Sequence, residues 1–197
     1  GLVWSGGAFR NIANSRRTLN KYEDLKGLKI RVMQSPVWLE TFKAMGINAT
    51  PIPYAEVYTA LEIKALDGLE HPPVDMYQNK IYEVQKYLAL THHGYTPVAL
   101  VVSSKWFNTL PADQQAAIRK AAETARDFQR IEEPKQENVA VNLLRSNGMT
   151  VTEFSPQDID KMRAAVKPAI DKFSANIGPE FVKSFYAEID KARKSLK

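Results

Sequence analysis

Arg31 is the residue of this 197-residue chain whose surroundings best suit a chemical task. It lies in the run from Leu28 to Met33, which alternates apolar and polar residues as a half-buried strand does. Ser35 and Pro36 follow, and a serine N-cap with proline at the first helical position marks the start of a helix. A guanidinium donates hydrogen bonds in a planar fork, and a helix N-terminus adds unpaired N–H groups and a positive dipole end. This combination suits a carboxylate ligand.

Arg10 offers a second guanidinium, in an extended segment just after Gly6-Gly7. A single arginine is most often a surface charge. Two arginines at strand ends that lead toward helices favour a carboxylate clamp, because ligands bind at such ends in open α/β sheets. Tyr54 follows Pro53 at a strand-to-helix junction, where core packing and ligand contact explain it equally well.

Catalytic and metal-binding motifs are missing from the sequence. Histidine occurs only at His71, His92 and His93, and adjacent histidines point in different directions, so the pair is a poor metal site. The chain has no cysteine, which excludes thiolate nucleophiles and cysteine-based metal centres. We expect no metal and no cofactor. An enzyme acting on organic acids, a lyase or isomerase that uses His71 with Glu70, is the alternative hypothesis.

The composition is that of an ordinary globular protein, with 44% hydrophobic and 25% charged residues. The net charge of +5 is spread among acidic residues, as in Asp160-Lys161-Met162-Arg163, and no dense basic block with interleaved aromatics occurs. We therefore expect no nucleic-acid partner. No apolar run has the length that a membrane span requires.

Short strands alternating with helices make α/β the predicted fold class. We expect a helical turn at 22–26, strands at 2–4, 8–12, 28–33, 49–52, 69–70, 97–103 and 149–154, and helices at 36–45, 55–65, 81–88, 111–145, 156–177 and 180–194. The apolar, β-branched run from Pro97 to Ser103 predicts a strand buried on both faces. Pro134 and Pro168 predict kinks in the two long helices.

Several runs, in order along the whole chain, resemble one known family. They are Leu25 to Pro36, Pro53 to Leu61, Asp67 to Pro72, Lys80 to Leu88, and Trp106 to Pro111. Together they resemble the DctP-type solute-binding proteins of tripartite ATP-independent periplasmic (TRAP) transporters. The resemblance implies a periplasmic receptor, not an enzyme, whose two α/β lobes close on an organic acid and present it to the transporter's membrane subunits. A C4-dicarboxylate or a related carboxylate is the expected ligand.

The resemblance also implies the site residues. It gives the position of Arg31 the principal salt bridge to the ligand carboxylate, and gives Arg10 a supporting role. Gln34 and Tyr54 fall at positions that often contact ligand. His71 stands where the family's D-G-x-E-N-P motif has asparagine, and imidazole is bulkier and titrates near neutrality. We therefore expect a His71 in the pocket to make affinity depend on pH more strongly than asparagine would.

By the same mapping, residues 8–96 and 137–197 form a second, ligand-clamping lobe. Residues 1–7 and 97–136 form hinges and part of a first lobe, with the long helix from Pro111 bridging both. The resemblance implies that the N-terminal part of the first lobe is absent from this sequence. Unpaired sheet edges would then let the chain self-associate or require the missing N-terminal segment as a partner.

Overall fold

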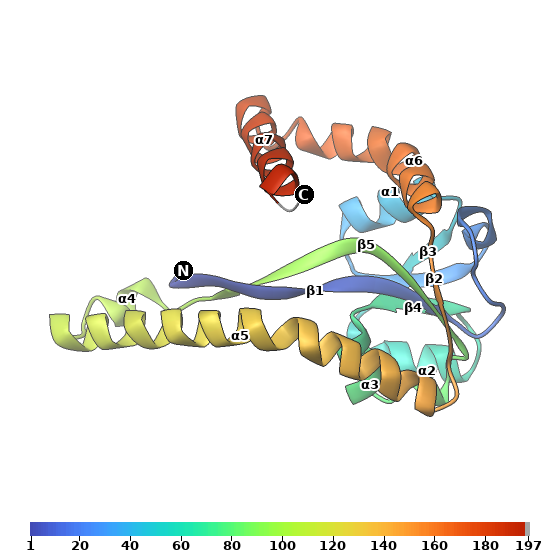
Figure 1. Cartoon of the computed structure of the whole chain (residues 1–197), viewed down its shortest axis with the longest axis horizontal. Coiled ribbons are helices and arrows are strands. Elements are labelled where there is room, and N and C mark those ends of the chain that lie inside the picture. Colours follow the sequence, from blue (N-terminus) through green and yellow to red (C-terminus); the bar gives the residue numbers. More distant parts are fainter. Residues whose placement is uncertain (196–197) are drawn as a thin grey trace.

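The computed structural model describes residues 1–195 as one six-stranded mixed sheet with helices on both faces (Figure 1). The strands are β1 (Val3–Asn14), β2 (Lys29–Val32), β3 (Asn48–Pro51), β4 (Gly68–His71), β5 (Tyr87–Leu100) and β6 (Thr150–Glu153). Their order across the sheet is β3-β2-β4-β1-β5-β6. β1 runs antiparallel to both of its neighbours, and the remaining pairs are parallel. The predicted α/β class is confirmed, and the sheet is mixed.

Seven α-helices and three short 3₁₀ helices are found in residues 1–195. The α-helices are α1 (Pro36–Ala44), α2 (Val57–Glu62), α3 (Pro73–Gln78), α4 (Ser104–Phe107), α5 (Ala112–Ser146), α6 (Pro156–Ser174) and α7 (Pro179–Ser195). The 3₁₀ helices are η1 (Tyr22–Leu25), η2 (Tyr54–Glu56) and η3 (Ile81–Glu83). None of the helices in the described range combines the length and the apolar character that crossing a membrane requires.

The sheet separates two hydrophobic cores, because successive strand residues point to opposite faces. Ile12 packs in the core that includes Phe42 of α1 and Met162 of α6. The next residue, Ala13, packs in the core that includes Leu144 of α5. The apolar pattern of the strands thus fixes which helices cover which face, and with them the register of the strands that carry the arginines.

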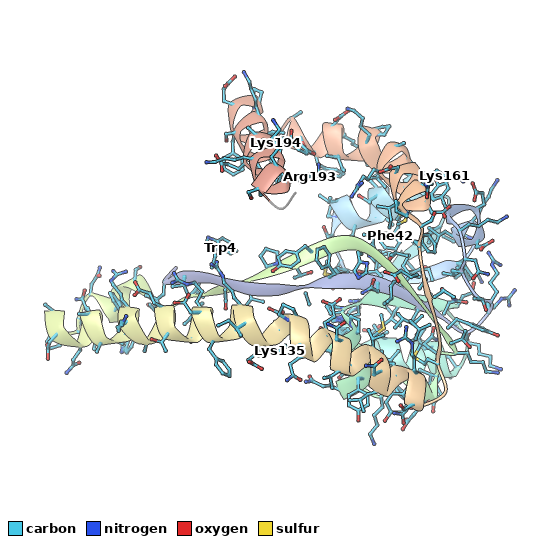
Figure 2. The ribbon with its side chains drawn as sticks, in the orientation of Figure 1. Trp4, Phe42, Lys135, Lys161, Arg193 and Lys194 are labelled. Atoms are coloured by element: carbon cyan, nitrogen blue, oxygen red, sulfur yellow. The ribbon has the colours of Figure 1, made fainter. Side chains whose placement is uncertain are left out.

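Strands β1 and β5 extend beyond the rest of the sheet as a two-stranded arm, with α5 beside them (Figure 1). Here Val3 pairs with Leu100, and Arg130 Nη2 of α5 donates to the Trp4 carbonyl oxygen at 2.8 Å. Large apolar side chains are exposed on this arm and on the α5 segment beside it; they include Trp4, Val98, Leu100, Phe128 and Ile131. Figure 2 shows Trp4 projecting from the ribbon of the arm.

Most predicted elements are confirmed, and two predictions are wrong. The expected helix at 81–88 is only the turn η3, because Tyr87 and Leu88 already pair with β1. Residues Pro97 to Ser103 are not a strand buried on both faces, since the strand ends at Leu100 and lies in the exposed arm. Helix α3 was not predicted at all. Pro134 lies inside the continuous α5, whose second half turns away from the line of its first half (Figure 1).

Phe42 is a sharp test of the core on the α1 face, because it is 0% exposed and packs against Trp38 and His93. We predict that Phe42→Ala lowers the free energy of unfolding by about 3–5 kcal/mol, the range for truncating a buried phenylalanine. Phe128→Ala is the matched control, because Phe128 is 67% exposed. Urea unfolding of the two variants measures the difference, and equal losses would contradict this description of the core.

Candidate functional site

The two predicted arginines reach the same end of the sheet from strands on either side of β4. Arg31 of β2 lies opposite Leu69 of β4 in a parallel pair, and β4 ends two residues later at His71. On the other side of β4, Asn11 of β1 pairs with His71, which sets the preceding Arg10 at this end as well. The carboxyl ends of parallel strands are where open α/β sheets bind ligands.

Arg31 is a buried cation whose surroundings hold it in place without neutralising it. Arg31 is only 4% exposed, and its Nε and Nη2 donate to the Ile52 carbonyl oxygen at 3.0 and 2.9 Å. The guanidinium carbon lies 5.5 Å from the centre of the Tyr54 ring. Within residues 1–195, no carboxylate pairs with Arg31 and no hydrogen bond uses its Nη1. Burial lowers the pKa of Arg31, Glu70 opposes that effect, and Arg10 adds to it.

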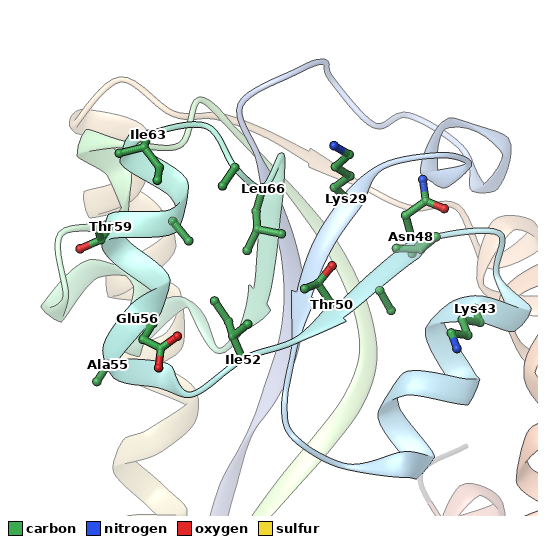
Figure 3. A pocket seen from close by; sticks show the side chains of 14 residues that line it. Lys29, Lys43, Asn48, Thr50, Ile52, Ala55, Glu56, Thr59, Ile63 and Leu66 are labelled. Atoms are coloured by element: carbon green, nitrogen blue, oxygen red, sulfur yellow. The ribbon is translucent and has the colours of Figure 1, made fainter.

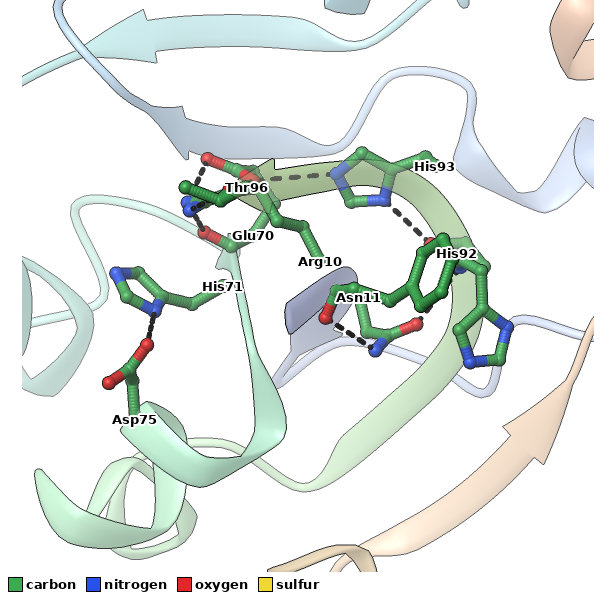
Figure 4. A network of polar contacts seen from close by, with 10 residues as sticks. Arg10, Asn11, Glu70, His71, Asp75, His92, His93 and Thr96 are labelled. Atoms are coloured by element: carbon green, nitrogen blue, oxygen red, sulfur yellow. Dashed lines mark hydrogen bonds and ion pairs between the residues drawn. The ribbon is translucent and has the colours of Figure 1, made fainter. Parts of the chain in front are cut away.

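Arg10, in contrast, is paired with the carboxylate of Glu70 (Figure 4). Its Nη2 donates to Glu70 Oε1 at 2.8 Å and to the Glu70 carbonyl oxygen at 3.0 Å, and its Nε pairs with Oε2. Both residues are buried, at 3% and 0% exposed. The remaining nitrogen, Nη1, has only a long contact of 3.5 Å to Thr96 Oγ1. Arg10 therefore lies in the site with most of its donors already used.

His93 completes this buried network from β5. Its Nε2 lies 3.4 Å from Glu70 Oε2, and its Nδ1 lies 2.8 Å from Thr91 Oγ1. Burial alone raises the pKa of Glu70, but hydrogen bonds from His93 and Arg10, with their charges, bring that pKa below its usual value. Glu70 is thus an ionised carboxylate that two side chains from two other strands share. No sequence pattern indicated this contact, and His93 had been expected only to be a poor metal ligand.

Trp38 of α1 covers the network, and Gly94 makes room for it. The Trp38 ring lies 5.5 Å from the Arg10 guanidinium carbon and meets His93 edge-on at 5.8 Å. A Cβ atom on Gly94 would approach Trp38 Cη2 to 2.5 Å, so a larger residue there would displace the ring. Trp38 therefore excludes solvent from the Arg10–Glu70 pair on the side of α1.

The remaining predicted site residues flank Arg31. Tyr54 packs between Arg31 and His71, with 4.8 Å between the Tyr54 and His71 ring centres. His71 Nδ1 lies 3.0 Å from Asp75 Oδ2 of α3. Gln34 is exposed in the loop between β2 and α1, and Ser35 occupies the predicted N-cap position of α1 without a side-chain hydrogen bond. Four of the five predicted residues are thus linked by direct contacts or by the Glu70–His71 segment, and Gln34 lies on the adjoining loop.

A separate hollow lies along the free edge of β3, with a volume of about 970 Å³ (Figure 3). Lys43 and Asn48 are on one side of it, and Glu56 and Ile63 of the η2–α2 segment are on the other. None of the five predicted site residues lines it. Residues 1–195 contain no group of three or more histidine, aspartate or glutamate side chains that could hold a metal ion.

Removing the counter-ion of Arg10 tests the buried network. We predict that Glu70→Gln lowers the free energy of unfolding by about 3–5 kcal/mol, because it leaves a buried guanidinium without its charge partner. The control Glu188→Gln, which removes an exposed ion pair with Lys191, should cost less than about 1 kcal/mol. Urea unfolding of both variants provides the comparison.

The same network predicts a pH dependence of stability. Since the folded state lowers the pKa of Glu70, its contribution is complete above the unfolded value of about 4.3 and is lost as pH falls through the folded value. The wild type should therefore lose stability on acidification more steeply than Glu70→Gln. Parallel stability curves from neutral pH down to acid would contradict the pairing.

Comparison with known proteins identifies the family. Residues 1–176 match the DctP family, described as bacterial extracellular solute-binding protein, family 7. The 2,3-diketo-L-gulonate-binding periplasmic protein YiaO of Escherichia coli is 42% identical over 127 residues, which are 64% of this chain and 38% of YiaO.

Two solved structures share the fold. The sugar acid binding protein DctPAm of Advenella mimigardefordensis, in complex with galactonate, is 40% identical with a TM-score of 0.90, over 98% of this chain and 62% of DctPAm. A TRAP periplasmic solute-binding protein of Sulfitobacter sp. NAS-14.1, with bound β-D-galacturonate, is 31% identical with a TM-score of 0.84, over 92% of this chain and 59% of that one. The chain spans about half the length of the first curated relatives it matches, 47% and 52%. From the family match over most of its length, the chain belongs to the DctP family of bacterial extracellular solute-binding proteins.

Proposed function

We propose that this protein binds an organic acid by its carboxylate, with Arg31 as the principal partner, and acts as the receptor of a TRAP transporter. The observation that carries the proposal is that Arg31 is a buried cation with no carboxylate partner in residues 1–195. A buried charge is costly unless it is paired, and the family's function supplies an anion to pair with it. The unused Nη1 and the second hydrogen on Nη2 give that anion its donors.

The charges at this end of the sheet favour a ligand with one carboxylate. Arg10 and Glu70 neutralise each other. Of the two arginines, only Arg31 therefore lacks a carboxylate partner in residues 1–195. Arg10 supports the site mainly as part of its floor, and only its Nη1 has capacity left for a ligand oxygen. A second carboxylate of a C4-dicarboxylate would need a cation from outside this group.

Sugar acids are the ligand class that these features favour. The structures described above hold galactonate and galacturonate, each with one carboxylate and several hydroxyl groups. In this chain Tyr54 lies against Arg31, His71 packs on Tyr54, and Gln34 lies on the adjoining loop; all three carry polar groups that suit hydroxyl groups by hydrogen bonding. We therefore favour a sugar acid over the C4-dicarboxylate expected from the sequence.

The enzyme hypothesis has lost its support. The family is one of solute-binding proteins, and the relatives described above are named for binding. Glu70, the proposed catalytic partner of His71, is committed to Arg10 and His93 in a buried network. Such a carboxylate can position a guanidinium but is not free to act as a general base.

The setting of the receptor follows from its family. We propose that it works in the periplasm and delivers its ligand to the membrane subunits of a TRAP transporter. The description of its family as extracellular supports the location. The division into lobes (8–96 with 137–197, and 1–7 with 97–136) also remains a proposal. Its support is the arm, where residues of 1–7 and 97–136 expose apolar side chains that a further part of the receptor would cover.

Calorimetry on Arg31 tests the binding proposal. We predict that Arg31→Lys weakens galactonate binding by about 1.5–3 kcal/mol, because lysine keeps the charge and loses the planar fork. Arg163→Lys is the control, since Arg163 forms an exposed pair with Asp160 on α6. Unchanged affinity in Arg31→Lys, in a protein that binds galactonate, would refute the assignment of Arg31.

The exposed arm generates a separate prediction about self-association. We expect the 197-residue chain on its own to self-associate through its exposed apolar arm, because contiguous exposed apolar surface drives association. The double variant Trp4→Ser, Val101→Ser should shift the sedimentation profile toward monomer. A control double variant outside the arm, Val37→Ser on α1 with Ile63→Ser at the end of α2, alters two other exposed apolar side chains and should leave it unchanged. A monomer at all concentrations for the unaltered chain would contradict the expectation.

A further inference from the structure

Pro51, Ile52 and Pro53 form the segment that joins the end of β3 to the start of η2. The Ile52 side chain packs against the core that includes Leu61 and lines the hollow along β3 (Figure 3). The Ile52 carbonyl oxygen accepts the two hydrogen bonds that Arg31 donates. Ile52 therefore links the hydrophobic core to the guanidinium of the proposed site.

The bonds to Ile52 use one edge of the Arg31 guanidinium and leave another edge open. A guanidinium has five N–H donors in a planar fork. The edge formed by Nε and one hydrogen of Nη2 faces the Ile52 carbonyl oxygen, at 3.0 and 2.9 Å. The edge formed by Nη1 and the second hydrogen of Nη2 fits the two oxygens of a carboxylate. The position of the Ile52 carbonyl thus decides which edge of Arg31 faces a ligand.

Pro53 restricts the backbone of Ile52. The residue before a proline is kept extended, because the proline ring collides with its backbone in the helical region. Pro53 itself has φ −55° and ψ 147°, and its carbonyl oxygen accepts from the Glu56 N–H at 3.2 Å at the start of η2. The direction of the Ile52 carbonyl is therefore set by two restraints, its side chain in the core and the proline that follows it.

We propose that Pro53 is a positioning residue of the ligand site, which holds the Ile52 carbonyl against the Nε–Nη2 edge of Arg31. A ligand carboxylate then binds at the Nη1–Nη2 edge. This inference rests on the proposed function of Arg31, and Pro53 needs no contact with the ligand. Without the restraint, the free protein would also populate orientations of Arg31 that do not bind. The apparent affinity falls with the fraction of protein that is competent to bind.

The experiment is calorimetry with galactonate on Pro53→Ala and on the matched control Pro51→Ala. We expect Pro53→Ala to bind about two- to fivefold more weakly than the wild type, the effect of removing one proline restraint from the backbone. Pro51→Ala should keep the wild-type affinity, because Pro51 restricts Thr50, which its pairing with β2 already holds in the sheet. Circular dichroism of each variant checks that the fold is intact.

A double-mutant cycle with Arg31→Lys separates positioning from a general effect on the fold. A lysine ammonium is a point charge without a planar edge for the Ile52 carbonyl to occupy. Pro53→Ala should therefore cost no further affinity in the Arg31→Lys background. An equal loss in both backgrounds would mean that Pro53 acts through the neighbouring Tyr54 or through the fold, and would overturn the inference.

The remaining outcomes separate this inference from the proposed function. Failure of the wild type to bind galactonate or galacturonate would remove the proposed sugar-acid function, and this inference with it. Galactonate binding of equal strength in the wild type and in Pro53→Ala, or an equal loss in Pro51→Ala, would overturn the inference alone. A crystal structure of the galactonate complex tests the same geometry without a substitution. A carboxylate on the Nη1–Nη2 edge of Arg31 is the expected result, and a carboxylate on the Nε–Nη2 edge, with the Ile52 carbonyl displaced, would contradict the inference.

Discussion

The structure depends on how three buried charges from three strands are balanced at one end of the sheet. Glu70 on β4 neutralises Arg10 on β1, and Arg31 on β2 is left without a carboxylate among the described residues. Buried ions are tolerated in proteins when they are paired and hydrogen-bonded. The Ile52 carbonyl oxygen and the Tyr54 ring fix the Arg31 guanidinium in space, and neither of them carries a full negative charge. An anionic ligand therefore provides what the fold itself does not.

The rest of the fold can be understood as support for this arrangement. The apolar residues of the strands alternate between two cores, and that alternation prevents a slip of register that would move the arginines to other positions. Trp38, which fits against Gly94, keeps solvent from the Arg10–Glu70 pair. His93 shares the Glu70 carboxylate from the far side. Rigid placement of this kind reduces the cost of ordering the site when a ligand arrives.

Short sequence patterns predicted the strands and helices that interactions between neighbouring residues determine. The alternation around Arg31 and the Ser35-Pro36 signal predicted a strand, a loop and a helix, and the structure has them as β2 and α1. Other features depend on contacts between distant segments. Residues 81–88 have helical spacing, but Tyr87 and Leu88 join β5 because β1 offers them a partner. The pairing of Arg10 with Glu70 joins residues 60 positions apart, and no pattern in the sequence shows which acidic residue would neutralise which arginine. His93 was missed for the same reason. The grouping of Arg31, Arg10, Tyr54 and His71 at one end of the sheet was thus predictable, and the family resemblance implied a principal Arg31 with a supporting Arg10. The Glu70 carboxylate that neutralises Arg10 was not predictable.

The most direct measurement is a crystal structure of the protein with galactonate bound. The account predicts the ligand carboxylate within hydrogen-bonding distance of the Arg31 guanidinium, with the Arg10–Glu70 pair intact beside it. A galactonate whose carboxylate lies elsewhere, for example in the hollow along β3, with Arg31 still lacking an anion, would contradict the account.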